Sequence, residues 1–353
     1  MNYCILNGKK STLIKGLLIQ SLPPISKPLM RTQIDEIDGR DGDIVTKLGY
    51  SAYNKEMSIG LFGDFDIDEV IEYFNSEGEV IFSNEPDKFY RYEIIEQIDF
   101  ERLIRFKTAT VTFHVQPFKF SAVDDEFIIS KNKIRPRPFT QSKNGVTISV
   151  ESGVISVVGE ALVTTEYYIP INEMILDGNY TLQADCDGSG ETACQIRVIE
   201  SVPTDADSFG GTSYQLDSSV EATANADKTF HYIWMRISAG VALDYDLYIQ
   251  MLDNGFNSFK LLNRGNTKSR PTFTIYGTGT VKLSITAVEV FTMSIDGYIT
   301  LNGEEMNAYK GDVLKNRYVS GDFNDLVLKS GANTISWTGT VTQITVENVS
   351  RWI

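Results

Sequence analysis

The chain has 353 residues, 42% of them hydrophobic and 11% aromatic, and its 47 Asp and Glu residues outnumber 32 Lys and Arg, which gives a formal net charge of -15. A chain of this length is expected to form two or three domains rather than one core. Its acidic balance repels phosphate backbones, so we expect no specific binding of nucleic acid.

Membrane and export signals are missing from the sequence. No apolar stretch reaches the roughly 18 residues that a membrane-spanning helix needs, so we expect no membrane insertion. The first residues show no basic segment followed by an apolar run, and we expect no secretory signal. Cys186 and Cys194 could face each other across a hairpin. In a reducing cytoplasm, however, two free thiols are the favoured interpretation.

Residues 1 to about 118 predict a mainly β unit with one helix. Apolar residues recur at helical spacing over 66–77, at Ile67, Val70, Ile71 and Phe74. Asp66 is placed as the N-cap, and Glu69 is placed to reach back to it as in a capping box. A long alternating strand follows, and we expect it to end at Pro117.

Residues from about 144 to 254 are rich in Thr, Ser, Gly and Asp and show no helical pattern. The predicted strands of this region are Val146 to Val150, Val154 to Val158, Tyr180 to Ala184, Ile196 to Ile199, Phe230 to Ile237 and Asp244 to Met251. Several short strands separated by turn residues indicate a β-sandwich or jelly roll.

Residues from about 257 to 353 are again predicted to be all β. The strand candidates are Thr272 to Ile275, Thr280 to Ile285, Glu289 to Ile295, Tyr298 to Leu301, Thr334 to Thr338 and Gln343 to Val346. Asp296-Gly297 and Asn302-Gly303 are dipeptides that favour tight turns, and both predict hairpins.

Short sequence motifs near both ends of the chain resemble those of a known protein family. Near the N-terminus stand Pro23-Pro24-Ile25 and Ile37-Asp38-Gly39-Arg40-Asp41-Gly42. Near the C-terminus stand Asn263-Arg-Gly-Asn266, Arg270-Pro271, Tyr276-Gly277-Thr-Gly279, Gly321-Asp322-Phe323 and Gly331-Ala-Asn333-Thr-Ile335. Their order and spacing resemble the distal tail (Dit) proteins of long-tailed bacteriophages that infect Gram-positive hosts.

The resemblance implies a mainly β fold in three parts. A β-rich belt domain with one helix would cover 1–118. A galectin-like β-sandwich would cover 119–133 and 256–353. A jelly-roll-like β-sandwich over 134–255 would be inserted into a loop of that second domain, as in extended members of the family whose inserts bind carbohydrate. Such grafting is physically easy, because the entropy of closing a surface loop grows only slowly with its length.

The resemblance also implies a structural role rather than an enzyme. The chain would be the hub at the virion tail tip, made in the host cytoplasm and assembled as a homo-hexameric ring, single or as two stacked rings. Its partners would be the tail tube protein, the tail-associated lysin or tip protein, and a host cell-wall saccharide. No cofactor is expected. The alternatives are a standalone carbohydrate-binding adhesin and a tail-borne glycan hydrolase.

The usual catalytic motifs are not found. His114 and His231 are the only histidines, which argues strongly against a zinc hydrolase. No Gly-x-Ser-x-Gly elbow is present. The Gly-Lys-Lys-Ser11 run lacks the upstream glycine of a phosphate-binding loop. A glycosidase needs only two carboxylates, so the sequence leaves that activity open.

The sharpest candidate site is the strand from Phe230 to Ile237. Alternation puts Ile233, Met235 and Ile237 on one face and Phe230, Tyr232, Trp234 and Arg236 on the other. Aromatic rings stack on the C–H face of a pyranose, and charged or amide groups bind its hydroxyls. If the next strand is its neighbour, one concave saccharide surface would hold Tyr232, Trp234, Arg236, Asp246, Tyr248 and Gln250. The alternative is that Tyr232 and Trp234 belong to the core, with Arg236 at its rim.

The only metal candidate is an oxygen-rich run with the spacing of the start of a calcium loop: Asp185, Asp187, Ser189 and Glu191. The twelfth position of that loop is Ile196, where a bidentate glutamate would be needed. A polar hairpin turn is therefore the favoured interpretation, and no metal is assigned.

Overall fold

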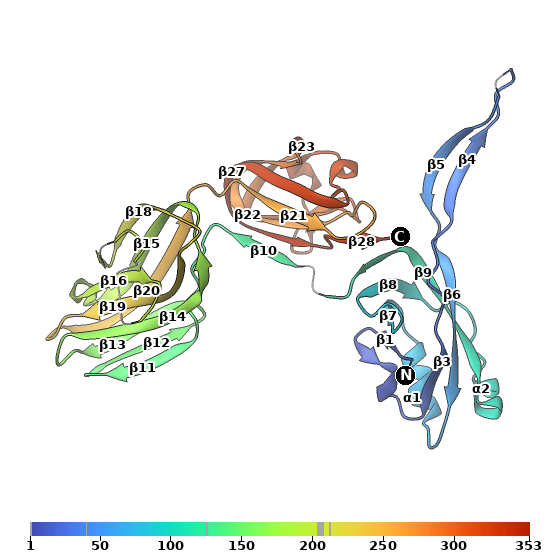
Figure 1. Cartoon of the computed structure of the whole chain (residues 1–353), viewed down its shortest axis with the longest axis horizontal. Coiled ribbons are helices and arrows are strands. Elements are labelled where there is room, and N and C mark those ends of the chain that lie inside the picture. Colours follow the sequence, from blue (N-terminus) through green and yellow to red (C-terminus); the bar gives the residue numbers. More distant parts are fainter. Residues whose placement is uncertain (1, 40, 124–125, 203–207, 212) are drawn as a thin grey trace. The chain divides into compact units, whose positions relative to one another are not determined.

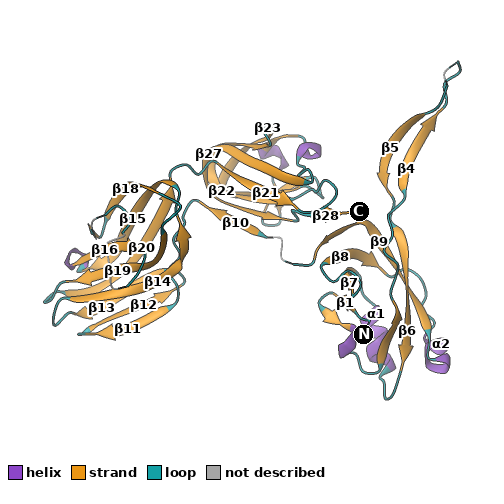
Figure 2. Ribbon diagram, viewed as in Figure 1, coloured by secondary structure: helices purple, strands orange, loops and turns teal. Residues whose placement is uncertain are grey.

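The computed structural model describes residues 2–353 except 40, 124–125, 203–207 and 212. Across the described residues the chain is mainly β, as predicted, and it has two α-helices and four short 3-10 helices (Figures 1 and 2). It divides into two compact units. The first is Met1–Ile128 with Phe259–Gly339 and Thr345–Ile353, and the second is Ile129–Ser258 with Thr340–Ile344. The finer three-part division stays a prediction.

The N-terminal part of the first unit is built on a sheet with the strand order β2-β1-β7-β8-β9-β6-β3, and β28 pairs with β9. Its strands are β1 (Cys4–Leu6), β2 (Lys9–Lys10), β3 (Leu17–Ser21), β6 (Tyr53–Leu61), β7 (Gly78–Phe82), β8 (Lys88–Glu93), β9 (Ala109–Ser121) and β28 (Arg351–Trp352). A 3-10 turn, η1 (Ser11–Leu13), lies between β2 and β3. Alternate residues of the two longest strands, such as Met57 and Phe113, are fully buried in the core.

Two α-helices accompany this sheet, and the sequence predicted only the first. Helix α1 (Ile67–Phe74) begins at Asp66, whose side chain accepts hydrogen bonds from the backbone N–H groups of Asp68 and Glu69 at 3.0 and 3.4 Å. The N-cap prediction is confirmed. The capping-box prediction is wrong, because the Glu69 carboxylate instead accepts from the backbone N–H of Lys15 at 3.3 Å.

The second helix, α2 (Phe100–Phe106), is capped by Asp99. It was missed because only Leu103 is buried, and one buried residue leaves no helical periodicity to detect.

Strand β9 runs through Pro117 to Ser121 and does not end at the proline as predicted. The β8–β9 register shifts where Tyr92 pairs with Val115 and Tyr90 with Lys119, which leaves Pro117 in the irregular stretch between them. A proline is tolerated at such a position because no regular ladder hydrogen bond needs its missing N–H.

A separate two-stranded sheet is formed by β4 (Met30–Asp35) and β5 (Ile44–Tyr50). We call this hairpin the arm. It pairs with no other described strand, and Figure 1 shows it extending away from the sheet that contains β6.

The C-terminal part of the chain forms a sheet with the order β10-β27-β22-β23-β24-β25, with β21 beside β27 and β26 beside β23. Its strands are β10 (Phe127–Ser130), β21 (Ser258–Asn263), β22 (Thr272–Ile285), β23 (Val288–Asn302), β24 (Asn307–Lys310), β25 (Val313–Leu314), β26 (Val319–Gly321) and β27 (Gly331–Glu347). Two 3-10 helices, η3 (Asn316–Tyr318) and η4 (Phe323–Asp325), flank β26.

Three pairs of predicted strands in this region are single long strands. Asp296-Gly297 lies inside β23, with Gly297 paired to Gly277 of β22, so the predicted hairpin there is wrong. The turn between β22 and β23 is instead made by Thr286 and Ala287, both with positive φ. Asn302 does lead into the turn between β23 and β24, as predicted, and its side chain accepts two backbone N–H groups there.

The second unit is a sandwich of two sheets, ordered β11-β12-β13-β20-β15-β18 and β14-β19-β16-β17. The six-stranded sheet contains β11 (Phe139–Lys143), β12 (Val146–Glu151), β13 (Val154–Glu160), β15 (Gly178–Ser189), β18 (Ser218–Ala224) and β20 (Ala242–Asp253). The four-stranded sheet contains β14 (Thr165–Ile175), β16 (Cys194–Ile199), β17 (Tyr214–Gln215) and β19 (Thr229–Ile237), and η2 (Glu191–Ala193) lies between β15 and β16. One buried cluster joins the inner faces of both sheets.

Candidate saccharide and assembly surfaces

The structure separates the six predicted saccharide residues into two groups of three. Tyr232, Trp234 and Arg236 lie on β19, which belongs to the four-stranded sheet. The other three, Asp246, Tyr248 and Gln250, lie on β20 in the six-stranded sheet. The two strands are not neighbours.

The inward residues of both strands share one core, to which Ile233 and Leu247 belong. The alternate residues of β19 and β20 therefore face outward on opposite sides of the sandwich. The expectation of one shared surface is thus wrong. Phe230 also departs from its predicted face, because it is buried in the core.

Trp234 lies on the outward side of β19 but is covered. It pairs across the sheet with Tyr168 of β14 and Arg197 of β16. The Arg197 guanidinium carbon lies 4.9 Å from the centroid of the indole ring, and the tryptophan is only 5% exposed. A stacked arginine shields an aromatic ring and stabilises it by a cation–π contact. Trp234 is therefore neither part of the sandwich core nor an open stacking platform.

Tyr232 is half-buried beside an open cavity of about 450 Å³. Other polar groups around this cavity are Arg137, Glu200 and the exposed His231. An aromatic ring, a cation and a carboxylate around one cavity supply both a stacking face and groups that bind hydroxyls. The sequence did not reveal Arg137 and Glu200, since they come from distant segments and share no spacing with Tyr232.

The opposite face of the sandwich carries Tyr248, which is 44% exposed. It pairs across the sheet with Asp185 of β15, and Asp246 pairs with Asp187. The side-chain amide of Gln183 donates to both carboxylate oxygens of Asp185, at 3.1 and 3.0 Å. This face presents an exposed aromatic ring among acceptors that hydrogen bonds already hold in place.

The positions of the calcium candidates in the strands decide whether they can form a calcium loop. Asp185, Asp187 and Ser189 are part of β15, and Glu191 opens η2, so these residues form no calcium loop. Within the described part of the chain, no three His, Cys, Asp or Glu side chains gather closely enough to hold a metal ion. Cys4, Cys186 and Cys194 are free thiols.

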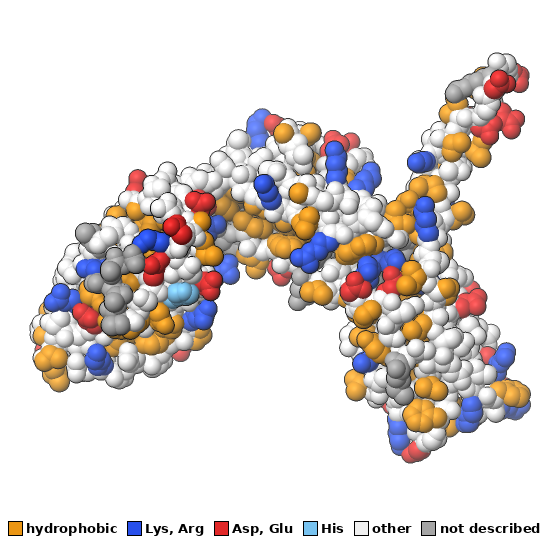
Figure 3. All heavy atoms as spheres, in the orientation of Figure 1, with side chains coloured by type: hydrophobic (Ala, Val, Ile, Leu, Met, Phe, Trp, Pro, Cys, Tyr) orange, Lys and Arg blue, Asp and Glu red, His pale blue; other side chains and the backbone are white. Residues whose placement is uncertain are grey.

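The arm presents a group of exposed apolar side chains. Ile34 and Val45 are a direct cross-strand pair, exposed at 58% and 54%, and Leu48 is exposed at 54%. Acidic residues, among them Asp35 and Asp43, stand next to these apolar ones. Figure 3 shows both kinds of side chain on the arm, hydrophobic ones in orange and acidic ones in red.

No family model and no curated protein matches this chain. Among solved structures, the SPP1 Dit protein, titled a paradigm of the hub adsorption apparatus in Gram-positive infecting phages, aligns over 100% of both chains with 12% identity and a TM-score of 0.44. A conserved protein of unknown function from Pseudomonas aeruginosa PAO1 covers 63% of this chain and 98% of its own, with 9% identity and a TM-score of 0.15.

Neither likeness is close enough to establish a shared fold or a shared function. No helix in the described parts of the chain is long and apolar enough to cross a membrane.

Proposed function

We propose that the chain is a structural hub of a phage tail tip that forms a hexameric ring. The ring would join the tail tube protein to the tail-associated lysin or tip protein. In this proposal residues 1–118 form the ring, 119–133 and 256–353 form a galectin-like sandwich, and 134–255 bind a host cell-surface saccharide. The order and spacing of the sequence motifs near the two ends of the chain support this proposal.

The observation that carries the proposal is the arm. An isolated two-stranded hairpin is marginally stable at best in water. Here both strands are exposed along most of their length, and the Ile34–Val45 pair buries little apolar area within its own chain. Exposed apolar patches rimmed by charge mark interaction sites. A second copy of the chain is the simplest partner, because a head-to-tail contact between copies closes into a ring when its rotation allows.

The saccharide part of the proposal has two candidate faces in the second unit. One is the Tyr232 cavity with Arg137 and Glu200, and the other is the flat sheet face around Tyr248. Both combine an aromatic ring with charged acceptors, and they lie on opposite sides of the sandwich. Tyr232→Ala and Tyr248→Ala therefore test them separately.

The first experiment is the solution mass of the full chain by light scattering, with negative-stain images of the same fraction. Rings of six or twelve subunits with a central hole are the expected result. The double variant Ile34→Thr/Val45→Thr should shift the population to monomer, since it removes apolar surface but keeps β-branched side chains. Val158→Thr is the matched control, because Val158 is 51% exposed on β13. A wild-type monomer at all concentrations would favour the standalone saccharide-binding adhesin.

A further inference from the structure

A notch in the C-terminal sheet contains a small cavity that the proposed function does not use. Strand β23 pairs with β22 along its whole length. On its other edge it pairs with β26 only at Phe291–Met293 and with β24 only at Thr300–Asn302. Between these two pairings, residues 294–299 face no described strand on that edge. The cavity lies there and has a volume of about 140 Å³.

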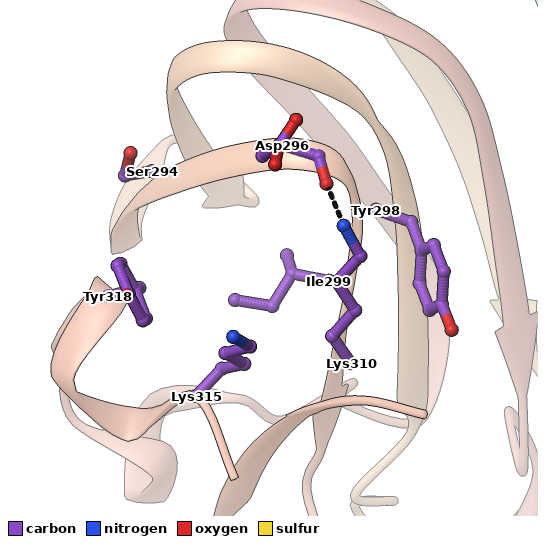
Figure 4. Close-up of a pocket in the computed structure, with 7 residues that line it drawn as sticks. All are labelled: Ser294, Asp296, Tyr298, Ile299, Lys310, Lys315 and Tyr318. Carbon is purple, nitrogen blue, oxygen red and sulfur yellow. Dashed lines mark hydrogen bonds between the residues drawn. The ribbon is translucent and has the colours of Figure 1, made fainter. Parts of the chain in front are cut away.

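Two lysines border this notch. Lys310 ends β24, and its ammonium group donates to the backbone carbonyl of Asp296. Lys315 is the N-cap of η3, and Figure 4 shows its side chain rising between Tyr318 and Ile299. Both lysines are half-buried, and neither forms an ion pair with any described carboxylate. Ammonium groups brought together around one cavity repel each other, so an anion between them is stabilised.

Aromatic rings flank the same cavity. The Lys310 ammonium lies 5.7 Å from the centroid of the Tyr298 ring, and that of Lys315 lies 5.1 Å from the Tyr318 ring. Arg317 holds Tyr318 in place, because one guanidinium nitrogen donates to the tyrosine hydroxyl at 2.8 Å and the guanidinium carbon lies 4.8 Å from the ring centroid. Unlike Trp234, however, Tyr318 remains 38% exposed. Ile299 is buried at the floor. The walls therefore offer apolar area for C–H groups beside the two cations.

Charge makes this site unusual in this chain. With a net charge of -15, most of the surface repels anions. Only one carboxylate, that of Asp296, belongs to the cavity lining, and this residue is exposed at the rim, where solvent screens it. The cavity is smaller than the roughly 300–1,000 Å³ of drug-sized sites, so it suits one small group such as a phosphate, and a larger group attached to it would lie at the mouth, against the exposed Tyr318.

We propose that this cavity binds a phosphorylated sugar, with the phosphate between Lys310 and Lys315 and the sugar ring against Tyr318. Ammonium groups bind phosphate through charge-assisted hydrogen bonds, which are about twice as strong as neutral ones. A tyrosine ring stacks on the C–H face of a sugar. This site lies on a different surface from Tyr232 and Tyr248, and it does not depend on ring assembly.

Calorimetric titration of the full chain with glucose 1-phosphate, glucose and inorganic phosphate tests the proposal. Glucose 1-phosphate should bind tightest, and its affinity should fall as salt is raised. Lys315→Gln should weaken it by about tenfold, as expected for loss of one charge-assisted hydrogen bond. Lys329→Gln, an exposed lysine outside the cavity, should leave it unchanged. Unchanged affinity in Lys315→Gln, or equal binding of glucose, would overturn the proposal.

Tyr318→Ala tests the contribution of the sugar ring to binding separately from that of the phosphate. This variant should lower the affinity for glucose 1-phosphate several-fold and leave the affinity for inorganic phosphate unchanged. Equal affinities for glycerol 1-phosphate and glucose 1-phosphate, or for phosphate alone, would remove the sugar ring from the proposal and overturn it. A thermal melt of each variant shows that it is folded before binding is compared.

Discussion

Lys119 and Glu85 form an ion pair at 2.7 Å inside the N-terminal part of the chain, where their side chains are only 7% and 9% exposed. Tyr90 donates to the other carboxylate oxygen of Glu85 at 2.6 Å. The buried Lys55 ammonium stands near the same group, 4.8 Å from the Tyr90 ring, and donates to the carbonyl of Pro24 at 2.7 Å. One carboxylate thus serves two buried cations, Lys119 on β9 and Lys55 on β6, and Lys55 also binds the segment that leads to the arm.

Glu85→Gln should destabilise the protein strongly. Burial alone would raise the pKa of Glu85, but hydrogen bonds from Lys119 and Tyr90 and the charges of both lysines hold it below its usual value. Removing the carboxylate leaves two buried ammonium groups without a counter-ion, which costs about 3–5 kcal/mol of unfolding free energy. Urea unfolding measures this loss. Glu101→Gln breaks the exposed pair with Arg105 and should cost no more than about 0.5 kcal/mol. Equal effects of the two variants would contradict the argument.

Stability should rise between about pH 8 and pH 9 because of Lys55. Burial lowers the pKa of this lysine from 10.5 to about 8, against the attraction of Glu85. Above pH 8 the unfolded chain holds a proton that the folded chain has lost, so the free energy of unfolding increases with pH. Below pH 8 both states are protonated, and this contribution is constant.

Unfolding at pH 7.5, 8.25 and 9 in wild type and Lys55→Met checks this expectation. The difference between the two proteins is the informative quantity. Burial raises the pKa of the Cys4 thiol to about 11, and that group acts in the opposite direction above pH 9 in both proteins. A difference that stays flat over this range would contradict the assignment to Lys55.

Much of this fold could be predicted from local sequence, and the wrong hairpin at Asp296-Gly297 shows one reason why the rest could not. Asp66 caps α1 as expected, because a cap depends on residues three positions apart. Asp296-Gly297 has the composition of a turn, but pairing with Gly277 keeps it inside a strand. Such long-range pairing overrides local turn preference.

The candidate site shows the same limit. Alternation placed Tyr232 and Tyr248 on outward faces, but it does not say which strands are neighbours, so their separation onto two sheets could not be predicted. Lys310 and Lys315 had no motif to mark them, because the notch that joins them to Asp296 is created by the sheet order.

Trp234 and Tyr232 should respond differently to truncation. Trp234→Ala removes a ring covered by Arg197 and should cost about 2–4 kcal/mol of unfolding free energy. Tyr232→Ala removes a half-buried ring at an open cavity and should cost less than about 1 kcal/mol, while lowering binding to host cell walls. Denaturant unfolding and a cell-wall pull-down measure the two quantities. If Trp234→Ala proves neutral for stability and abolishes wall binding, the ligand face includes the indole.

Gly339 lies in β27 against the backbone of β22, and Gly339→Ala should be clearly more destabilising than Gly331→Ala in the same strand. Its φ is +98°, and an added Cβ would come within 2.3 Å of the Thr280 backbone carbonyl oxygen. Gly331, with φ +92°, has no atom within 4 Å of the same position. Both alanines carry the backbone penalty of about 1–2 kcal/mol, and only Gly339→Ala adds a steric clash with backbone atoms. Thermal unfolding should therefore rank the wild type first, Gly331→Ala second and Gly339→Ala last. If the two variants unfold at the same temperature, β27 and β22 move apart at this point without loss of stability.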